Sequence, residues 1–515
     1  GIASKMGYEN NDPRRCRSGI LYTLNQLAEE GHVFAEPEQL VTAAKELLQA
    51  DDEPVRKVMA EMIAANDLIA DNEVVYLPPF YHAENGSAKR LTALLASNIS
   101  DSIEAEPELA YGAQQSTGIV YDEVQQAAIN QALDSKVMVL TGGPGTGKTT
   151  TTQGIIAAFK AKGKQIVLAA PTGRAAKRMT EATGMEAKTI HRLLEYNPMD
   201  GYKRNDENPL EGDVLIVDEC SMIDIMLFYN LMKAIPETMR LILVGDIDQL
   251  PSVGAGNVLR DIIDSRQIPV VRLTRIFRQA QSSRIVMNAH AINAGQFPNI
   301  SNGRNTDFFF IKAEDAETIP QLIVSLVRDR LSKTYGYKPK EIQVLTPMQR
   351  GNVGAGNLNT ELQSALNPSE PALTRGGYTF RQGDKVMQIR NNYDKNVFNG
   401  DIGYVNAVDT TERTLTVIYD GRLVEYDVSE LDELTLAYAV TIHKSQGSEF
   451  PVVVIPVTMK HYVMLQRNLI YTGITRAKKI CVLVGTTKAL AYAIKQNTVS
   501  KRNTKLKERL NDNCL

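Results

Sequence analysis

The stretch TGGPGTGKTT, residues 141–150, is the most informative part of this sequence. It follows the apolar run VMVL (137–140) and precedes a helical pattern. A glycine, four residues and then Gly-Lys-Thr is the spacing of a phosphate loop, in which backbone N–H groups at a helix N-terminus surround phosphates. We therefore expect Lys148 to reach the β- and γ-phosphates of a nucleotide and Thr149 to offer its hydroxyl to Mg²⁺. The alternative, a glycine-rich turn that binds nothing, is disfavoured because a strand precedes the loop and a helix follows it.

Two sets of apolar runs predict two parallel sheets. Short β-branched runs that alternate with helical segments indicate parallel strands covered by helices. The first set is VMVL (137–140), IVLAA (166–170), DVLIV (213–217), LILVG (241–245) and VVRL (270–273). The second set is IQVLTP (342–347), TLAYAV (435–440), PVVVIPV (451–457) and KKICVLVG (478–485). The predicted fold class is therefore α/β.

The rest of the chain has a different pattern. Residues 1–116 carry helical periodicity and predict a helical N-terminal domain. Residues 371–433 contain the hairpin signal Asp420-Gly421 between strand-like runs, which predicts a small antiparallel β-barrel inserted into the second α/β domain. The two α/β domains are then predicted to comprise residues 117–268 and residues 269–370 with 434–515.

Composition narrows the class of protein. The chain has 515 residues with 57 Lys and Arg against 60 Asp and Glu, a net charge of −3, so any basic surface is local. Its four cysteines show no metal-ligand spacing, which favours a reducing, cytoplasmic location. The apolar stretch 451–459 is too short to span a bilayer and the N-terminus lacks an apolar signal core, so no membrane partner is expected. Because residue 1 is Gly, we expect that upstream sequence has been removed.

Two adjacent carboxylates follow an apolar strand in DVLIVDECSM, residues 213–222. In a phosphate-loop protein Asp218 would hold Mg²⁺, directly or through water, and Glu219 would polarise the attacking water. A solvated pair at the end of a strand is the alternative. Gln249, in LVGDIDQLPSVGAG (243–256), could touch both the γ-phosphate and the attacking water, although a lone Gln after a strand is usually a loop residue.

Two arginines, Arg278 in LTRIFRQA and Arg476 in YTGITRAKK, belong to or border the second α/β domain. Phosphoryl transfer spreads negative charge over the γ-phosphate oxygens, and an arginine that arrives from another domain stabilises that charge. We expect this catalytic role for both residues. A solvated surface arginine is the alternative for each.

An ordered set of motifs carries a resemblance to a known family. The set is TGGPGTGKTT, APTGRAAKRM, TIHRLL, LIVDECSMID, LVGDIDQLPSVGAG, IFRQ, LTPMQRG, VFNGDIG, TIHKSQGSEF and YTGITRAKK. In this order it resembles the superfamily-one helicases of the RecD-like family, over about residues 12 to 510. The resemblance implies two RecA-like motor domains with ATP bound in the cleft between them.

The resemblance also implies nucleotide contacts beyond those argued from spacing. Gln125, in YDEVQQAAI, would read the adenine, although Gln126 beside it leaves the register open. Gly447 and Glu449, in TIHKSQGSEF, would approach the nucleotide. The whole predicted nucleotide set is Gln125, Gly143, Gly145, Thr146, Gly147, Lys148, Thr149, Thr150, Gly447 and Glu449.

The same motifs imply contacts to nucleic acid, with the first two residues of the set on a backbone phosphate. The predicted contacts are Pro171, Thr172, Arg174, Thr441 and His443. Two aromatic residues of the predicted barrel, Tyr393 and Phe398, could stack on bases or belong to its core.

Each of these contacts has an ordinary structural alternative. The helix after APTG carries Arg174, Lys177 and Arg178 and could simply present a solvated basic face. His191 and His443 could be buried core histidines.

Residues 195–212, EYNPMDGYKRNDENPLEG, are polar and rich in turn formers. Composition alone favours a surface loop. RecD-like helicases place a short hairpin, or pin, at this position to split the duplex. The resemblance therefore implies a pin whose turn is formed by residues 197–201.

The implied function is that of an ATP- and Mg²⁺-dependent DNA helicase. It would move 5′-to-3′ on single-stranded DNA, unwind tailed duplex DNA, and serve DNA repair and recombination. Three alternatives stay beside it: an RNA-translocating helicase of the same superfamily, a DNA-binding switch that uses ATP only to change affinity, and the RecD motor subunit of a multi-subunit exonuclease complex. No nuclease motif is recognisable, and the sequence indicates no protein partner.

Overall fold

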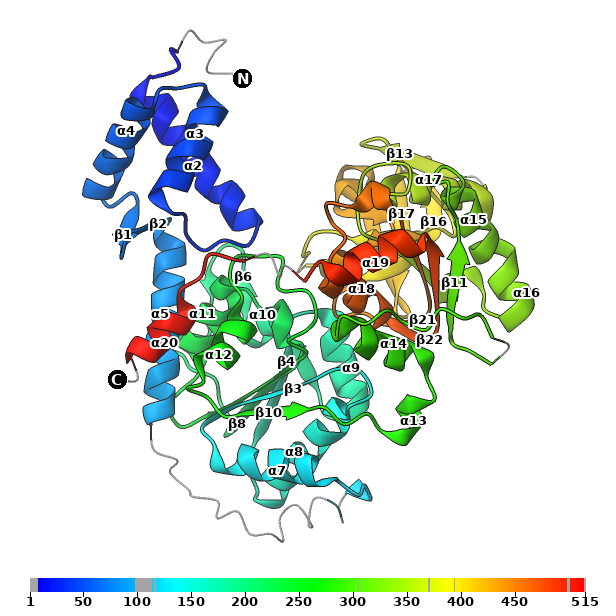
Figure 1. The fold of residues 1–515 in the computed structure, drawn as a ribbon, viewed down its shortest axis with the longest axis horizontal. Coiled ribbons are helices and arrows are strands. Elements are labelled where there is room, and N and C mark those ends of the chain that lie inside the picture. The colour runs from blue at the N-terminus through cyan, green and yellow to red at the C-terminus, as the bar shows by residue number, and fades with distance from the viewer. Residues whose placement is uncertain are drawn as a thin grey trace.

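The computed structural model describes residues 8–97, 114, 117–303, 305–368, 371–392, 394–497 and 501–513. Within these ranges the chain forms two parallel sheets, a small antiparallel sheet and an N-terminal group of helices, which Figure 1 shows. No helix of the described residues is long and apolar enough to cross a membrane.

The first parallel sheet has six strands in the order β10-β3-β9-β8-β4-β5. Its central strands are buried on both faces, which is why they appear in the sequence as unbroken apolar runs. The strands are β3 (Val137–Gly142), β4 (Ile166–Ala170), β5 (Ala187–Thr189), β8 (Val214–Val217), β9 (Arg240–Gly245) and β10 (Val270–Leu273). One face is covered by α7 (Glu123–Asp134), α8 (Lys148–Ala161) and α9 (Gly173–Thr183). The other is covered by α5 (Pro78–Ala96), α10 (Ile190–Leu193), α11 (Ile225–Ala234) and α12 (Val258–Ser265).

The second parallel sheet has five strands in the order β11-β22-β21-β12-β20. They are β11 (Phe308–Lys312), β12 (Ile342–Thr346), β20 (Ala439–Thr441), β21 (Phe450–Val457) and β22 (Ala477–Gly485). One face packs against α14 (Arg284–Asn293), α18 (Arg467–Ile474) and α19 (Thr487–Lys495). The other packs against α15 (Ile319–Ser325), the π-helix Leu326–Arg330, α16 (Leu331–Tyr335) and α17 (Ala355–Leu366). Both sheets confirm the predicted α/β class.

The small antiparallel sheet has the order β18-β17-β16-β15-β19 and its own buried core. Asp420 and Gly421 form the predicted hairpin turn, since both have positive φ, 48° and 85°, as a type I′ turn requires. The strands at the two ends of this order, β18 and β19, do not pair with each other among the described residues, so closure into a barrel stays a prediction. Its strands are β15 (Lys385–Gln388), β16 (Ile402–Asp409), β17 (Thr414–Tyr419), β18 (Arg422–Asp427) and β19 (Leu434–Leu436), beside a ribbon of β13 (Ala372–Arg375) and β14 (Tyr378–Arg381).

The N-terminal helices project away from the sheets in Figure 1 and enclose a separate core. They are α2 (Pro13–Glu29), α3 (Pro37–Leu48) and α4 (Asp52–Ala64), followed by the hairpin of β1 (Ile69–Asp71) and β2 (Val74–Tyr76). Short 3₁₀ turns occupy Cys220–Met222, Pro339–Glu341, Val428–Glu433, His443–Ser445 and Met459–His461.

Four predicted boundaries need correction. Residues 270–273 pair with β3, so the first α/β unit extends beyond residue 268. The small sheet extends past residue 433, because β19 pairs with β15. Helix α5 packs on α11 rather than with the other N-terminal helices, and α20 (Leu506–Asn513) packs on α5 and α12 rather than on the second sheet. In each case partners distant in the sequence decide where the element belongs.

Candidate functional site

A cavity of about 450 Å³ lies between the two parallel sheets. Loops after β3, β8 and β9 of the first sheet enter it from one side, and loops before β21 and β22 of the second sheet from the other. It brings together seven of the predicted residues: Lys148, Thr149, Asp218, Glu219, Gln249, Glu449 and Arg476. Residues predicted separately from five different motifs therefore meet in one site.

The phosphate loop has the backbone that its glycines permit. Gly145 and Gly147 have φ of 70° and 86°, and α8 begins at Lys148. A Cβ on Gly147 would lie 2.7 Å from Gln125 Nε2 and 2.8 Å from Phe277 Cε2, so no larger residue fits there. The ammonium of Lys148 donates a hydrogen bond to the carbonyl of Gly142 at 2.6 Å. The loop is therefore compact, with its lysine folded across it.

The remaining loop residues lie against helices that precede the second sheet. A Cβ on Gly143 would lie 2.9 Å from His290 Cε1, and one on Gly145 would lie 2.6 Å from Ala280 Cβ. Thr146 donates to the carbonyl of Gly143 at 2.7 Å and is buried, whereas Thr150 is half-buried in the first turn of α8. Movement of the second sheet would therefore reach the phosphate loop directly.

The geometry favours Gln125 over Gln126 as the adenine-reading residue. Gln125 is 1% exposed and forms a capping box with Asp122, yet among the described residues its Nε2 has no hydrogen-bond partner. Gln126 already donates to the carbonyl of Tyr121 at 2.8 Å. A buried donor without a partner is costly unless a ligand completes it, and Gln125 points its donor at the phosphate loop.

The two carboxylates have different environments. Glu219 has φ of 55°, and its backbone N–H donates to Asp218 Oδ1 at 2.7 Å. Burial and the Glu219 charge raise the pKa of Asp218 to about 6. Burial also raises the pKa of Glu219, but the charges of Arg178 and Arg476 outweigh it and hold that pKa below its usual value. Glu219 is therefore kept as a carboxylate, as a general base requires.

The sequence left open whether Arg178 lies on a solvated basic face, and the structure excludes that alternative for this residue. From α9 its guanidinium contacts Glu219 Oε1 and Glu449 Oε1, each at 2.6 Å, and Lys478 Nζ lies 3.3 Å from Glu449 Oε2. Arg178 therefore connects the first sheet to the second across the cavity. The four-residue spacing from Arg174, which places both on one helix face, was the only signal in the sequence.

Replacing Arg178 with Ala should lower DNA-stimulated ATP turnover by about tenfold or more. The change leaves the Glu219 carboxylate, whose side chain is 12% exposed, without its ion-pair partner, which raises the pKa of Glu219 and frees its side chain. The exposed carboxylate of Glu449 keeps its ion pair with Lys478. Steady-state ATPase at saturating single-stranded DNA measures this. The matched control is Lys162→Ala, which removes a positive charge from an exposed position at the end of α8. If Arg178→Ala turns over ATP at the wild-type rate, Arg178 does not hold Glu219 in its working state.

The loop after β9 is bonded to the second sheet at three points. Tyr471 donates to Asp246 Oδ2 at 2.7 Å, the Leu250 N–H donates to Thr472 Oγ1 at 2.9 Å, and Gln446 Nε2 donates to the Leu250 carbonyl at 2.9 Å. No pattern in the sequence indicated these contacts. They make the Gln249 loop a link between the sheets.

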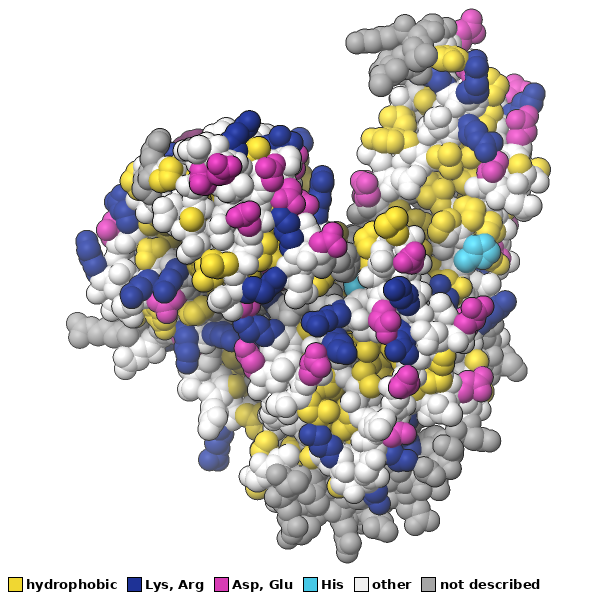
Figure 2. Space-filling view, turned by 180° about the vertical axis from the view of Figure 1, so that it is seen from behind, with side chains coloured by type: hydrophobic (Ala, Val, Ile, Leu, Met, Phe, Trp, Pro, Cys, Tyr) yellow, Lys and Arg dark blue, Asp and Glu magenta, His cyan; other side chains and the backbone are white. Residues whose placement is uncertain are grey.

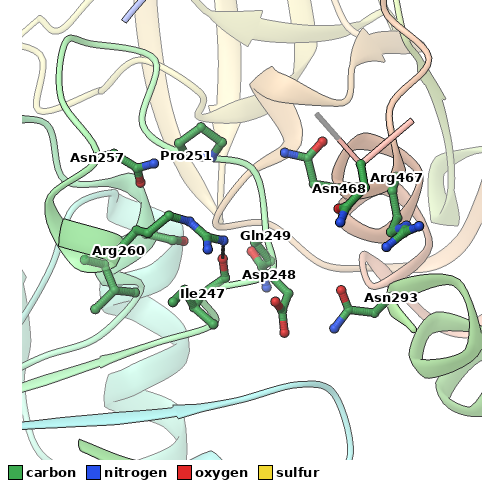
Figure 3. Close-up of a pocket in the computed structure, with 12 residues that line it drawn as sticks. Ile247, Asp248, Gln249, Pro251, Asn257, Arg260, Asn293, Arg467 and Asn468 are labelled. Atoms are coloured by element: carbon green, nitrogen blue, oxygen red, sulfur yellow. Dashed lines mark hydrogen bonds between the residues drawn. The ribbon is translucent and has the colours of Figure 1, made fainter. Parts of the chain in front are cut away.

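Polar groups also face one another across a small cavity beside the Gln249 loop. Figure 3 shows Asp248 and Gln249 on one side of a small cavity of about 50 Å³, with Asn293, Arg467 and Asn468 across it. Oε1 of Gln249 and Oδ1 of Asn468 are buried without a hydrogen-bond partner among the described residues. A buried acceptor without a partner costs free energy until a ligand or water completes it.

The two predicted arginine fingers lie in different places. Arg476 is 2% exposed, lines the 450 Å³ cavity and donates to the carbonyl of Ser448 at 3.1 Å. Arg278 begins α13 (Arg278–Gln281), is exposed, and lines a shallow pocket beside Phe277 instead. The N–H of Phe277 donates to the carbonyl of Gly145 at 3.2 Å. Arg278 therefore lies next to Phe277, which contacts the phosphate loop. Its role as a catalytic arginine stays a prediction.

A second cavity of about 390 Å³ gathers four of the five predicted nucleic-acid contacts: Thr172, Arg174, Thr441 and His443. Pro171 is half-buried and does not line it. Gly447, expected at the nucleotide, instead lies against Thr172, where a Cβ would be 2.6 Å from Oγ1. Burial lowers the pKa of His443, so a neutral imidazole faces this cavity.

This cavity continues into another of about 420 Å³ between the first sheet and the small antiparallel sheet. The two share Gly173, Arg174 and Asp401, and we call them together the basic groove. Its basic side chains are Arg174, Lys177, Lys188, Arg192, Arg422 and Lys444, and they outnumber the carboxylates of Asp224, Asp401 and Asp420 that also line it. Elsewhere the charges are mixed, since on the face drawn in Figure 2 Lys and Arg are interspersed with Asp and Glu. The basic surface is local, as the net charge of −3 predicts.

Phe398 is half-buried and lines the basic groove rather than the core of the small sheet. Tyr393 lies outside the described residues. His191 is not an isolated core histidine, because it packs against Tyr196 and Tyr202 with ring centroids 5.6 and 6.0 Å away.

Those two tyrosines belong to a hairpin inside the segment 195–212. Strands β6 (Tyr196–Asn197) and β7 (Gly201–Tyr202) pair antiparallel, and the tyrosine rings lie 4.7 Å apart. Met199 at the tip is 93% exposed. The segment after β7 is held to α5 by an ion pair of Arg90 with Asp206. The structure therefore has a short, aromatic-based hairpin with an apolar tip at this position.

Three family models match the chain. The AAA domain matches residues 125–255, the ATP-dependent RecD-like DNA helicase SH3 domain matches residues 358–419, and the UvrD-like helicase C-terminal domain matches residues 436–484. Their order agrees with the first sheet, the small antiparallel sheet and the end of the second sheet.

Two curated relatives are similar over most of the chain. The ATP-dependent RecD2 DNA helicase of Deinococcus radiodurans is 34% identical over 522 residues, covering 97% of this chain and 69% of that protein. The RecBCD enzyme subunit RecD of Mycobacterium tuberculosis is 31% identical over 471 residues, covering 83% of this chain and 79% of that protein. Among solved structures, Pif1 helicase from Bacteroides in complex with ADP-AlF3 and ssDNA has a TM-score of 0.45 and 21% identity over 72% of this chain and 94% of that chain, a likeness too distant for inference.

Proposed function

The chain belongs to the RecD-like family of ATP-dependent DNA helicases, and from that premise we propose that it moves 5′-to-3′ along single-stranded DNA and unwinds tailed duplexes. One observation carries the proposal. The nucleotide cavity and the basic groove both receive residues from the two sheets, and the loop that follows β9 borders both. Opening and closing of one cavity therefore changes the other.

In this proposal each residue of the nucleotide cavity has one task. Lys148 binds the phosphates, Glu219 accepts a proton from the attacking water, and Arg476 stabilises charge on the γ-phosphate. Gln249 contacts the water and passes the state of the nucleotide to its loop. The non-motor switch is disfavoured because these hydrolytic residues lie in one cavity.

Mg²⁺ fits the same cavity. Thr149 supplies a hydroxyl and Asp218 a carboxylate, both oxygen ligands of the kind that Mg²⁺ prefers. When bound, the ion neutralises charge on the β- and γ-phosphates. Its positive charge would also lower the pKa of Asp218 from the value of about 6 that burial and Glu219 produce.

The DNA strand is proposed to occupy the basic groove. Thr172 and Arg174 bind backbone phosphates there, and Phe398 stacks on a base. Contacts to phosphates release the counterions bound to DNA, so the affinity for DNA falls as the salt concentration rises. Because phosphate contacts do not read the sugar, RNA is tested beside DNA by comparing how strongly each stimulates the ATPase.

We favour a stand-alone helicase over the RecD subunit of an exonuclease complex. The likeness to the RecD2 helicase covers 97% of the chain, including the N-terminal helices, against 83% for the RecD subunit. A pull-down from the source organism distinguishes the two. The buried, unpaired thiols of Cys16, Cys220 and Cys481 support the cytoplasmic location expected from the sequence.

A further inference from the structure

The loop 252–256 separates the two sites of the motor. It follows Gln249, which lines the nucleotide cavity, and carries Val253 and Gly254, which line the basic groove. Val253 is 69% exposed, so its side chain is offered to whatever occupies the groove. The shape of this loop therefore affects both ligands.

Arg502, from the other end of the chain, is inserted into this loop. Its Nη1 donates to the carbonyls of Gly254 at 3.0 Å and Gly256 at 2.7 Å, and its Nη2 donates to the carbonyl of Ser252 at 2.7 Å. Nη1 also lies 3.3 Å from Ser252 Oγ. One guanidinium thus fixes three alternate carbonyls of the loop, a pattern that a lysine ammonium cannot reproduce.

No carboxylate forms an ion pair with Arg502 among the described residues, although Asp224 lies nearby. Burial lowers the pKa of Arg502 to about 10, against the opposing attraction of Asp224. A half-buried cation held mainly by neutral carbonyls costs desolvation free energy, which the charge-assisted hydrogen bonds offset. Such an arrangement fixes a conformation more than it adds stability.

The backbone around Arg502 is itself fixed. Asn503 N–H donates to His32 Nδ1 at 3.0 Å, and the Val33 N–H donates to the carbonyl of Asn503 at 2.8 Å. Gly31 closes the other side, since a Cβ there would lie 2.4 Å from Arg502 Nε. The chain then continues from Asn503 into α20, which packs on α5 and α12 of the first sheet's domain, whereas the preceding helix α19 packs on the second sheet, as Figure 1 shows toward the red end of the chain.

We infer that Arg502 is a positioning residue that holds the loop 252–256 in the shape that couples DNA in the basic groove to ATP hydrolysis. It touches neither ligand and acts through the loop. Its charge also reaches His443 and Asp224, which line the groove. The inference rests on the proposed function in one respect, that single-stranded DNA stimulates the ATPase.

The test compares Arg502→Gln with Lys501→Gln, which removes the same charge from the exposed neighbouring position. ATPase rates are measured over a titration of single-stranded DNA. For Arg502→Gln we expect the ratio of stimulated to unstimulated rate to fall at least about fivefold and the half-saturating DNA concentration to rise. The control should stay within about twofold of wild type.

Arg502→Lys keeps the half-buried charge but reaches fewer carbonyls, so it decides the question if Arg502→Gln is unstable. A reduced stimulation ratio at an unchanged melting temperature supports the inference. A wild-type ratio in Arg502→Lys, or an equal fall of both rates in Arg502→Gln, would overturn it, because a merely structural residue affects both rates alike. If wild type itself shows no stimulation by DNA, the proposed function fails instead.

Discussion

Glu219→Gln should bind ATP almost normally and lose about 100- to 10,000-fold in turnover. The amide has the same shape and can still accept the hydrogen bond from Arg178, but it cannot take a proton from water. Its backbone position, at φ of 55°, suits Gln no worse than Glu. Binding of a fluorescent nucleotide and steady-state ATPase, each with DNA present, measure the two effects separately.

Two controls make this result specific. Glu186→Gln removes an exposed carboxylate beyond the cavity and should leave turnover near wild type. Lys148→Ala should instead weaken nucleotide binding, because its ammonium is the charged group of the phosphate loop. If Glu219→Gln keeps a near-normal ATPase rate, Glu219 is not the base.

Removing the tip of the hairpin should abolish unwinding and leave DNA-stimulated ATPase within about twofold of wild type. A wedge acts only where strands separate, whereas hydrolysis needs only the cavity and a bound strand. The structure narrows the change to residues 197–201, replaced by a short Gly-Ser link. Tyr196 and Tyr202 then keep their packing on His191, and the ion pair of Arg90 with Asp206 stays intact.

The matched control is the same replacement at residues 410–412, an exposed turn between β16 and β17. This turn lies at the opposite end of β17 from Tyr419, which lines the basic groove. Strand separation from a 5′-tailed duplex and ATPase are measured on both proteins. Normal unwinding by the shortened hairpin would mean that this segment is a surface loop and that the wedge lies elsewhere.

The sequence could predict residues that meet in the 450 Å³ cavity because the patterns that identify them are local. A phosphate loop needs its glycines, lysine and threonine within one turn, and a metal-binding carboxylate must follow a strand. Lys148, Asp218 and Arg476 were found from such short patterns, and the structure places them in one cavity. Likewise, Asp420-Gly421 specified its own turn through positive φ.

Residues whose surroundings come from distant segments could not be predicted in this way. Arg178 appears in the sequence as one of several basic residues on a helix, and only tertiary packing turns it toward Glu449. Arg502 lies 246 residues from Gly256, whose carbonyl it binds. The boundary at residue 268 was misplaced for the same reason, because pairing with β3 decides where 270–273 belongs.

The most direct test of the account is strand separation on three duplexes that differ only in their tails, one 5′, one 3′ and one blunt. A translocase that grips one strand in the basic groove and moves 5′-to-3′ needs a single-stranded 5′ tail on which to start. With ATP and Mg²⁺ we expect unwinding of the 5′-tailed duplex alone, and none with Lys148→Ala. Equal unwinding of the 3′-tailed duplex would contradict the direction, and no unwinding of any duplex by a DNA-stimulated ATPase would contradict the helicase mechanism proposed for this chain.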